Sequence, residues 1–124
     1  MIRVSTRFQI ADNSGAKIAE CIKILGRSPL NTAFIGDKIV VSIKKHNNKS
    51  KPKAKKGDVK KAIIVNTKRR HTRPDGTYIK FDNNQIVLLN EQQNPLGTRL
   101  FTSVPFEVLN RKNKNLSSIA SAVI

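Results

Sequence analysis

Residues 38–44 alternate between apolar and polar side chains, and this pattern constrains the fold more than any other in the sequence. Ile39, Val41 and Ile43 share one face, whereas Lys and Ser occupy three of the four remaining positions. Successive side chains of a β-strand point to opposite faces, so this spacing predicts a strand with one buried face. A sheet, and not a helical bundle, is therefore expected around this segment.

Five further segments in the first ninety residues have extended patterns, namely residues 7–11, 16–25, 59–67, 77–81 and 85–89. In 16–25 we expect Ile18, Ile22 and Ile24 to share one face, with Glu20 at its rim. Turns are expected at 12–15 and 74–76, because Asp and Asn bond their own backbone and Gly accepts positive φ. The spacing of strands and turns predicts an all-β fold, either a small barrel or a sandwich.

The C-terminal part of the chain has a different pattern. Residues 103–110 are expected to form one or two helical turns, and residues 116–123 have apolar side chains at helical spacing. A length of 124 residues suits one domain. We therefore predict a single domain over 1–124, with the barrel at about 1–90 and a helical region at about 95–124.

The chain is strongly basic, with 24 Lys and Arg against 8 Asp and Glu and a formal net charge of +16. Thirteen of the basic residues lie between Lys44 and Arg73, where Asp58 is the single acid. Like charges at this density repel one another unless a polyanion neutralises them, so a phosphate backbone is the expected partner. The block comprises a basic loop, residues 44–57, and a basic ribbon, a predicted hairpin at 66–81.

The basic loop and the basic ribbon are expected to bind in different ways. Residues 46–57 contain no large apolar side chain, so alone they should be mobile and would become ordered on RNA. The arginines of the ribbon are planar forks that match phosphate geometry. Release of condensed counterions would supply the affinity. The candidate RNA-binding residues are Lys44, Lys45, Lys49, Lys51, Lys53, Lys55, Lys56, Lys68, Arg69, Arg70, Arg73 and Lys80.

Other anionic partners fit the sequence less well. An anionic membrane is the second candidate, but the basic block has no apolar face at helical spacing that would insert. No apolar run reaches the ~20 residues of a membrane span. Of five Phe and one Tyr, only Tyr78 and Phe81 lie near the charge. This scarcity disfavours binding of single strands by stacked rings and favours the backbone of folded, double-stranded RNA.

Catalytic and metal-binding chemistry is not indicated. The sequence has neither a Walker-type phosphate loop nor a G-x-G-x-x-G motif. His46 and His71 are far apart, and with the single Cys21 they lack metal-ligand spacing. Asp12 and Asp75 are expected to form turns, and Cys21 to be a small buried residue in a reducing compartment. No enzymatic activity and no cofactor are therefore expected.

A long motif joins the end of one predicted strand to the beginning of the last. It runs from the apolar residues 62–65 through Asp75, Gly76, Phe81 and Asn84 to Val87 and Leu88. Further matching blocks lie at 11–16, 21–26, 36–37, 55–59, 73–76 and 97–99. Over about residues 1–104, the chain resembles the family of protein fourteen of the large ribosomal subunit.

The resemblance implies a closed five-stranded β-barrel with a projecting β-ribbon and short C-terminal helices. It implies a non-catalytic constituent of the large subunit that binds large-subunit ribosomal RNA and neighbouring ribosomal proteins. Family members lie on the subunit interface, where they form bridges to small-subunit RNA and where factors that keep the subunits apart dock. Thr98 and Arg99 are the candidate residues for that interface. Asn13 and Ser14 either contact RNA or serve only the first turn.

The sequence departs from the family pattern near its C-terminal end. Residues 102–104 are Thr-Ser-Val where the family has Gly-Pro-Val, residues 105–109 differ from an Arg-Glu-Leu-Arg-like stretch, and Asn115 replaces a lysine. These changes fall where partner proteins and subunit-separating factors would dock. Docking is therefore expected to rely on Thr98 and Arg99.

The composition bears on the location of the ribosome and leaves two alternatives for function. Lys, Ile and Asn are abundant and have codons rich in A and T, which favours the mitochondrial matrix over the bacterial cytoplasm. One alternative is a soluble barrel that binds free RNA or single-stranded DNA. The other is an enzyme acting on RNA, for which the sequence supplies no convincing site.

Overall fold

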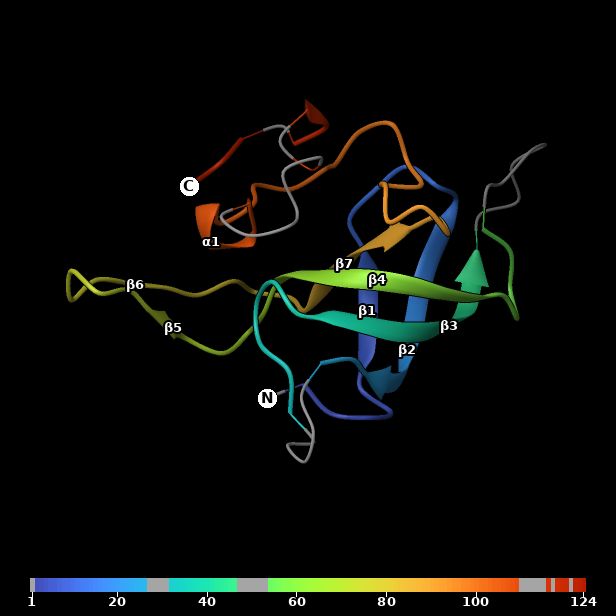
Figure 1. The fold of residues 1–124 in the computed structure, drawn as a ribbon, viewed down its shortest axis with the longest axis horizontal. Coiled ribbons are helices and arrows are strands. Elements are labelled where there is room, and N and C mark those ends of the chain that lie inside the picture. The colour runs from blue at the N-terminus through green and yellow to red at the C-terminus, as the bar shows by residue number, and fades with distance from the viewer. Residues whose placement is uncertain (1, 27–31, 47–53, 110–115, 117, 121) are drawn as a thin grey trace.

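Five strands form a closed barrel in the order β1, β2, β3, β4, β7 in a computed structural model of the chain (Figure 1). The structure describes residues 2–26, 32–46, 54–109, 116, 118–120 and 122–124. The barrel strands are β1 (Arg7–Ile10), β2 (Ala16–Ile24), β3 (Lys38–His46), β4 (Val59–Asn66) and β7 (Gln85–Leu89). All pairings are antiparallel except the closing pair, in which β1 runs parallel to β7. The closed five-stranded barrel is thereby confirmed, and a sandwich is excluded.

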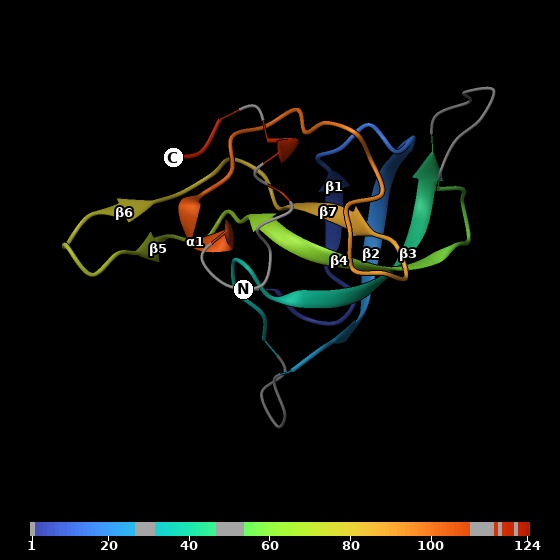
Figure 2. The ribbon, with the colours of Figure 1, turned by 45° about the horizontal axis from the view of Figure 1, so that its top comes forward.

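A two-stranded ribbon projects from one end of the barrel (Figures 1 and 2). Its strands are β5 (His71–Thr72) and β6 (Tyr78–Ile79), in which His71 lies opposite Ile79. The expected return arm at 77–81 is shorter as a strand, but the hairpin itself is confirmed. The short helix α1 (Phe106–Leu109) lies near the base of this ribbon.

One hydrophobic cluster fills the interior of the barrel with alternate residues from every strand. The predicted face of β3, formed by Ile39, Val41 and Ile43, is buried in this cluster. The other strands contribute Phe8, Ala19, Cys21, Ala62, Ile64, Ile86 and Leu88. Because side chains alternate across each strand, the residues between these positions point out of the barrel.

A second cluster covers the outer face of β4 and β7. Ile63 and Val65 of β4 pack with Val87 and Leu89 of β7, and all four are buried. The residues that cover them come from the C-terminal part of the chain and include Leu100, Val104, Val108 and Leu116. Burial on both faces explains why 62–65 and 86–89 are unbroken apolar runs. It also holds the C-terminal segment across the strand that leads into the ribbon.

The three isoleucines predicted for one face of β2 do not share a face in the structure. Ile22 is 45% exposed and Ile24 is partly buried against the core, whereas Ala16, Ala19 and Cys21 are the buried core residues of β2. The pairing of β2 with β3 shifts register three times, and each bulge reassigns the faces that simple alternation predicts. Glu20 therefore lies on the outer side of the barrel, opposite Arg7 of β1. Its carboxylate forms an ion pair with Arg7 at 3.8 Å.

The described C-terminal residues form less helix than their apolar spacing predicts. Of the described residues in 103–110, only α1 is helical, and Ala120 N–H donates to the Leu116 carbonyl oxygen at 3.0 Å. Val123, expected to continue that pattern, instead pairs in parallel with Val104. Among the described residues, no helix is long and apolar enough to cross a membrane.

Candidate nucleic-acid interface

Strand β4 divides the basic block into two parts at opposite ends of the barrel (Figures 1 and 2). The end of β3, with Lys44 and Lys45, lies beside the start of β4, and the basic ribbon follows the end of β4. β4 has 8 residues. At ~3.3 Å per residue it separates the two parts by roughly 25 Å. A single phosphate group therefore cannot contact both parts.

The base of the basic loop is fixed. Lys55 N–H donates to Asp58 Oδ2 at 3.0 Å, and Lys56 N–H donates to His46 Nδ1 at 3.0 Å. Ala54 is fully buried. The side chains of Lys55 and Lys56 are thus presented on a closed turn at the end of the barrel.

The expectation that residues 46–57 are mobile on their own stays a prediction, although both ends have defined contacts. His46 completes β3, and residues 54–57 form the turn described above, with a small buried alanine and backbone hydrogen bonds. Lys49, Lys51 and Lys53 lie outside the described residues.

The tip of the ribbon is a tight turn. Arg73 N–H donates to the Thr77 carbonyl at 2.8 Å, and Gly76 has a φ of 91°, which a residue without Cβ adopts readily. Asp75 accepts hydrogen bonds from the hydroxyl of Thr77 at 2.6 Å and from its N–H at 3.0 Å. These two bonds lower the pKa of Asp75, and the bond from the hydroxyl has the larger effect. Asp75 has the role of a turn former that the sequence predicted.

Two arginines at the root of the ribbon lie over aromatic rings. The guanidinium carbon of Arg69 is 5.6 Å from the centroid of Phe34, and that of Arg70 is 4.8 Å from the centroid of Tyr78. Such contacts restrict the arginine side chain and leave its N–H groups available for other partners. Both arginines are exposed, as are Lys68 and Lys80 on the two arms.

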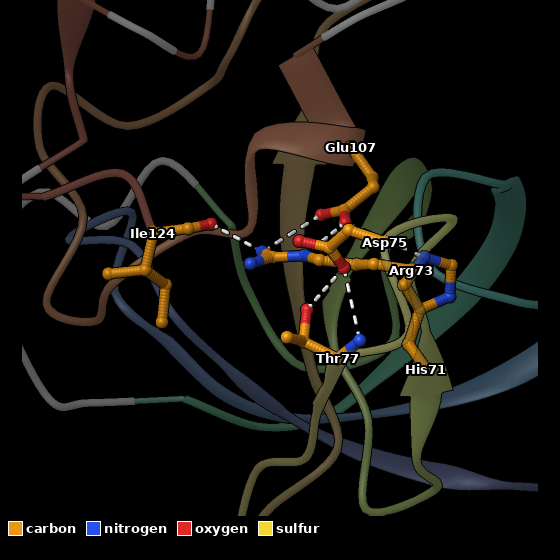
Figure 3. Close-up of polar contacts among 6 residues, drawn as sticks. All are labelled: His71, Arg73, Asp75, Thr77, Glu107 and Ile124. Carbon is orange, nitrogen blue, oxygen red and sulfur yellow. Dashed lines mark hydrogen bonds and ion pairs between the residues drawn. The ribbon is translucent and has the colours of Figure 1, made fainter.

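Arg73 has a different environment from the other ribbon arginines (Figure 3). Its Nε donates to Glu107 Oε1 at 2.6 Å, and one terminal nitrogen donates to the Ile124 carbonyl at 2.6 Å. Its guanidinium also lies 4.6 Å from the centroid of Phe106, and its side chain is only 20% exposed. Arg73 therefore connects the ribbon to the C-terminal segment.

Glu107 is the acidic centre of this contact. Burial raises the pKa of its carboxyl, but hydrogen bonds from Arg73 and the backbone, with the charges of Arg73 and His71, outweigh burial. The net effect holds the pKa of Glu107 below its ordinary value. Nε2 of His71 lies 3.8 Å from the same carboxylate. Two side chains of one ribbon arm thus face one acid of α1.

Thr98 and Arg99 lie on an exposed loop that Asn13 holds in place. Asn13 Oδ1 accepts hydrogen bonds from Thr98 N–H at 2.7 Å and Arg99 N–H at 3.3 Å. Asn13 Nδ2 donates to the Thr98 hydroxyl at 2.7 Å. The first turn therefore positions the two residues expected at the subunit interface. The sequence did not reveal this contact, because Asn13 and Thr98 are 85 residues apart.

Asp12 and Ser14 are buried and serve the turn. Asp12 Oδ1 accepts hydrogen bonds from the hydroxyl and N–H of Ser14 at 2.6 and 3.1 Å, and Oδ2 accepts one from Leu88 N–H at 3.2 Å. Ser14 is 2% exposed. Of the two uses weighed for Asn13 and Ser14, the structural turn explains the contacts of both side chains.

Within the described part of the chain, no three His, Cys, Asp or Glu residues are grouped as metal ligands would be. Cys21 is buried in the core, and burial raises the pKa of its thiol, which disfavours the reactive thiolate.

The barrel, the ribbon and the distribution of cations agree with a comparison of the sequence with protein families. The sequence model of the family described as Ribosomal protein L14p/L23e matches residues 1–124. The chain belongs to this family. Members of the L14p/L23e family are structural proteins of the large ribosomal subunit and are not enzymes. The chain is therefore a structural ribosomal protein that acts in translation, in association with ribosomal RNA and other ribosomal proteins. The match includes the C-terminal stretch in which the motifs become weak.

Sequence reasoning missed the partners of the ribbon arginines in this L14p/L23e chain. Phe34 lies in a connection with no pattern of its own, and Glu107 is 34 residues from Arg73. Two signals were available in the sequence. Phe34 is a single aromatic residue in a connection between strands, and Glu107 is an acid in the first turn of a helix in a chain with few acids. Neither signal identifies a partner without the fold.

Proposed function

We propose that this L14p/L23e protein binds large-subunit ribosomal RNA through two separate contacts, the basic loop at one end of the barrel and the basic ribbon at the other. The observation that carries the proposal is the stacking of Arg69 over Phe34 and Arg70 over Tyr78. Each ring restricts a planar fork before RNA arrives, so less entropy is lost on binding. Lys68 and Lys80 add point charges on the adjacent arms.

At the other end of the barrel, the lysines act as point charges for phosphate. Lys44 and Lys45 project from a strand, and Lys55 and Lys56 from a fixed turn. In the proposed complex Lys49, Lys51 and Lys53 contact the same RNA. Arg73 was expected among the phosphate contacts, and its intramolecular partners support a positioning role in place of one.

The proposed function includes a place on the intersubunit face. Thr98 and Arg99 are exposed on the loop held by Asn13, and the neighbouring Phe101 is 65% exposed. An exposed ring beside an arginine and a hydroxyl favours contact with another macromolecule. The proposed partners of this loop are a neighbouring ribosomal protein, the small-subunit RNA at a bridge, and a factor that keeps the subunits apart.

The proposed location is the mitochondrial matrix, with the bacterial cytoplasm as the alternative. The support is the abundance of residues with A/T-rich codons. Fractionation of source cells with an antibody to the chain separates the two locations.

Sedimentation tests the proposed function. The chain is expected to sediment with the large subunit after a wash at high salt, because its two cationic ends would be enclosed by RNA. Recovery only in ribosome-free fractions, together with tight binding to free oligonucleotides, would instead support the soluble nucleic-acid-binding barrel.

A further inference from the structure

A cavity of about 190 Å³ lies at the root of the ribbon. One side is apolar. It includes Ala33 and Phe34, from the segment that precedes β3, and Ile2, which pairs with Ala33. The other side is residues 68–71, Lys-Arg-Arg-His, where the chain leaves β4 for the ribbon. An apolar interior thus lies directly against three consecutive cations.

Hydrogen bonds fix both sides of the cavity. Phe34 N–H donates to Asp37 Oδ2 at 2.8 Å, which holds the turn that carries the ring. On the opposite side, Lys68 N–H donates to Asn84 Oδ1 at 2.8 Å, and Asn84 itself lines the cavity. The cavity is therefore formed in the free protein, so a ligand would not have to order its walls.

We propose that this cavity receives one unpaired base of RNA, whose flanking phosphates contact Lys68, Arg69 and Arg70. The proposal rests on the proposed binding of ribosomal RNA and names one nucleotide class within it. A base has flat apolar faces and lies on a charged backbone, which matches an apolar wall with cations at its rim. An unpaired base is also the least costly to move out of a helix.

Size and charge favour a base over other occupants. The volume suits one planar ring system and is smaller than the roughly 300–1,000 Å³ of pockets for drug-sized ligands. A free inorganic anion would leave the apolar wall next to Phe34 uncovered. An aromatic side chain of a neighbouring protein would fit the wall but would place no negative charge near Lys68, Arg69 and Arg70.

Tyr78 provides a matched control for Phe34. Each ring lies beneath an arginine, at 4.8 Å for Arg70 over Tyr78 and 5.6 Å for Arg69 over Phe34. Only Phe34 is among the residues that line the cavity. Phe34→Leu and Tyr78→Leu both remove an arginine–ring contact, so a difference between them reports on the cavity itself.

The test is chemical probing of protein-free large-subunit ribosomal RNA from the source organism, with and without the full chain. We expect the chain to protect the base of one unpaired nucleotide from dimethyl sulfate or carbodiimide. Phe34→Leu should raise the protein concentration needed for that protection about tenfold, because one base–aromatic contact is lost. Tyr78→Leu should raise that concentration less, by about threefold, because it loses an arginine–ring contact but no wall of the cavity.

A second variant keeps the test decisive where Phe34→Leu is unstable in a thermal melt. Asn84→Asp retains an acceptor for Lys68 N–H and adds a negative charge at the cavity, so it should weaken the same base protection about tenfold. Binding of the RNA without a base whose protection depends on Phe34 or Asn84 would overturn the cavity assignment and leave the proposed function standing. An absence of RNA binding by the wild-type chain would overturn both. Protection that appears only when a neighbouring ribosomal protein is added would assign the cavity to that protein.

Discussion

Arg73 and Glu107 are 34 residues apart in the sequence, and Arg73 Nε lies 2.6 Å from Glu107 Oε1 (Figure 3). A second nitrogen of Arg73 is 3.4 Å from Glu107 Oε2. The contact joins Arg73, which directly follows β5 of the projecting ribbon, to a helix that packs on the outer face of β4. Because a hairpin with two-residue strands has few contacts of its own, this pair fixes the direction of the ribbon.

Replacement of Arg73 by Ala should lower the free energy of unfolding by about 1–3 kcal/mol, because a largely buried carboxylate loses charged hydrogen bonds. Arg73→Lys should recover only part of the loss, since a lysine cannot donate to Glu107 and Ile124 in the same fork geometry. Urea denaturation measures both. Lys80→Ala, on the other arm and exposed, should change the value by less than about 0.5 kcal/mol. Equal losses for Arg73→Ala and Lys80→Ala would contradict the role given to the pair.

The same pair predicts a dependence of stability on acid pH. The pKa of Glu107 is lower in the folded chain than its ordinary value of 4.5, so its contribution is fully present above that value. As pH falls from about 4.5 through the lowered pKa, the carboxylate is protonated and the contribution is lost. Melting temperatures of wild type and Glu107→Gln between pH 7 and pH 3 should differ at neutral pH and converge in acid. A constant difference across this range would contradict the assignment.

The sequence predicted the strands well where one pattern determines one element. Residues 85–89 form a strand with the predicted bounds, and the buried face of 38–44 is the one that its alternation indicated. The face of β2 was wrong because bulges break the two-residue period, and a bulge depends on the partner strand. The continuous apolar runs at 62–65 and 86–89 contained a signal for burial on both faces that alternation alone does not use.

The candidate site was predictable in its charges but not in its contacts. The 44–73 block identified the basic segments, yet β4 places its two halves at opposite ends of the barrel. Arg69, Arg70 and Arg73 look equivalent in the sequence. In the fold two of them are exposed over rings and the third is held by Glu107, because the fold places a different partner beside each arginine.

The exposed ribbon arginines should matter more for assembly than the lysines at the other end. Arg69→Ala with Arg70→Ala should reduce incorporation into large subunits several-fold more than Lys55→Ala with Lys56→Ala. Both pairs remove two charges, but Phe34 and Tyr78 restrict the arginine forks in advance. Reconstitution with labelled chains measures the two losses side by side. An equal or reversed ranking would show that charge alone decides incorporation.

Binding of the isolated chain to large-subunit RNA should depend steeply on salt. If six to ten phosphates are neutralised, affinity should fall by about 10³–10⁵ between 50 and 200 mM salt, because the release of counterions contributes less free energy at high salt. Filter binding over this range gives the slope. Arg69→Ala should reduce the slope by about one, as expected for one lost phosphate contact, and Arg73→Ala should leave it nearly unchanged if the RNA still binds. A flat response would remove the electrostatic basis of the proposed function.

Gly97 should not tolerate a side chain, because its backbone passes against the first turn. A Cβ at this position would lie 2.7 Å from Asn13 Oδ1 and 3.0 Å from Asp12 Cβ. Asn13 cannot move away without breaking its hydrogen bonds to Thr98 and Arg99, so Gly97→Ala should lower the free energy of unfolding by roughly 1–3 kcal/mol. Thr98→Val, in the same loop, loses a single hydrogen bond and should cost about 0.5–1.5 kcal/mol. Chemical denaturation orders the two variants. A Gly97→Ala chain as stable as wild type would mean that the loop bearing Thr98 and Arg99 adjusts freely, and that Asn13 does not position it.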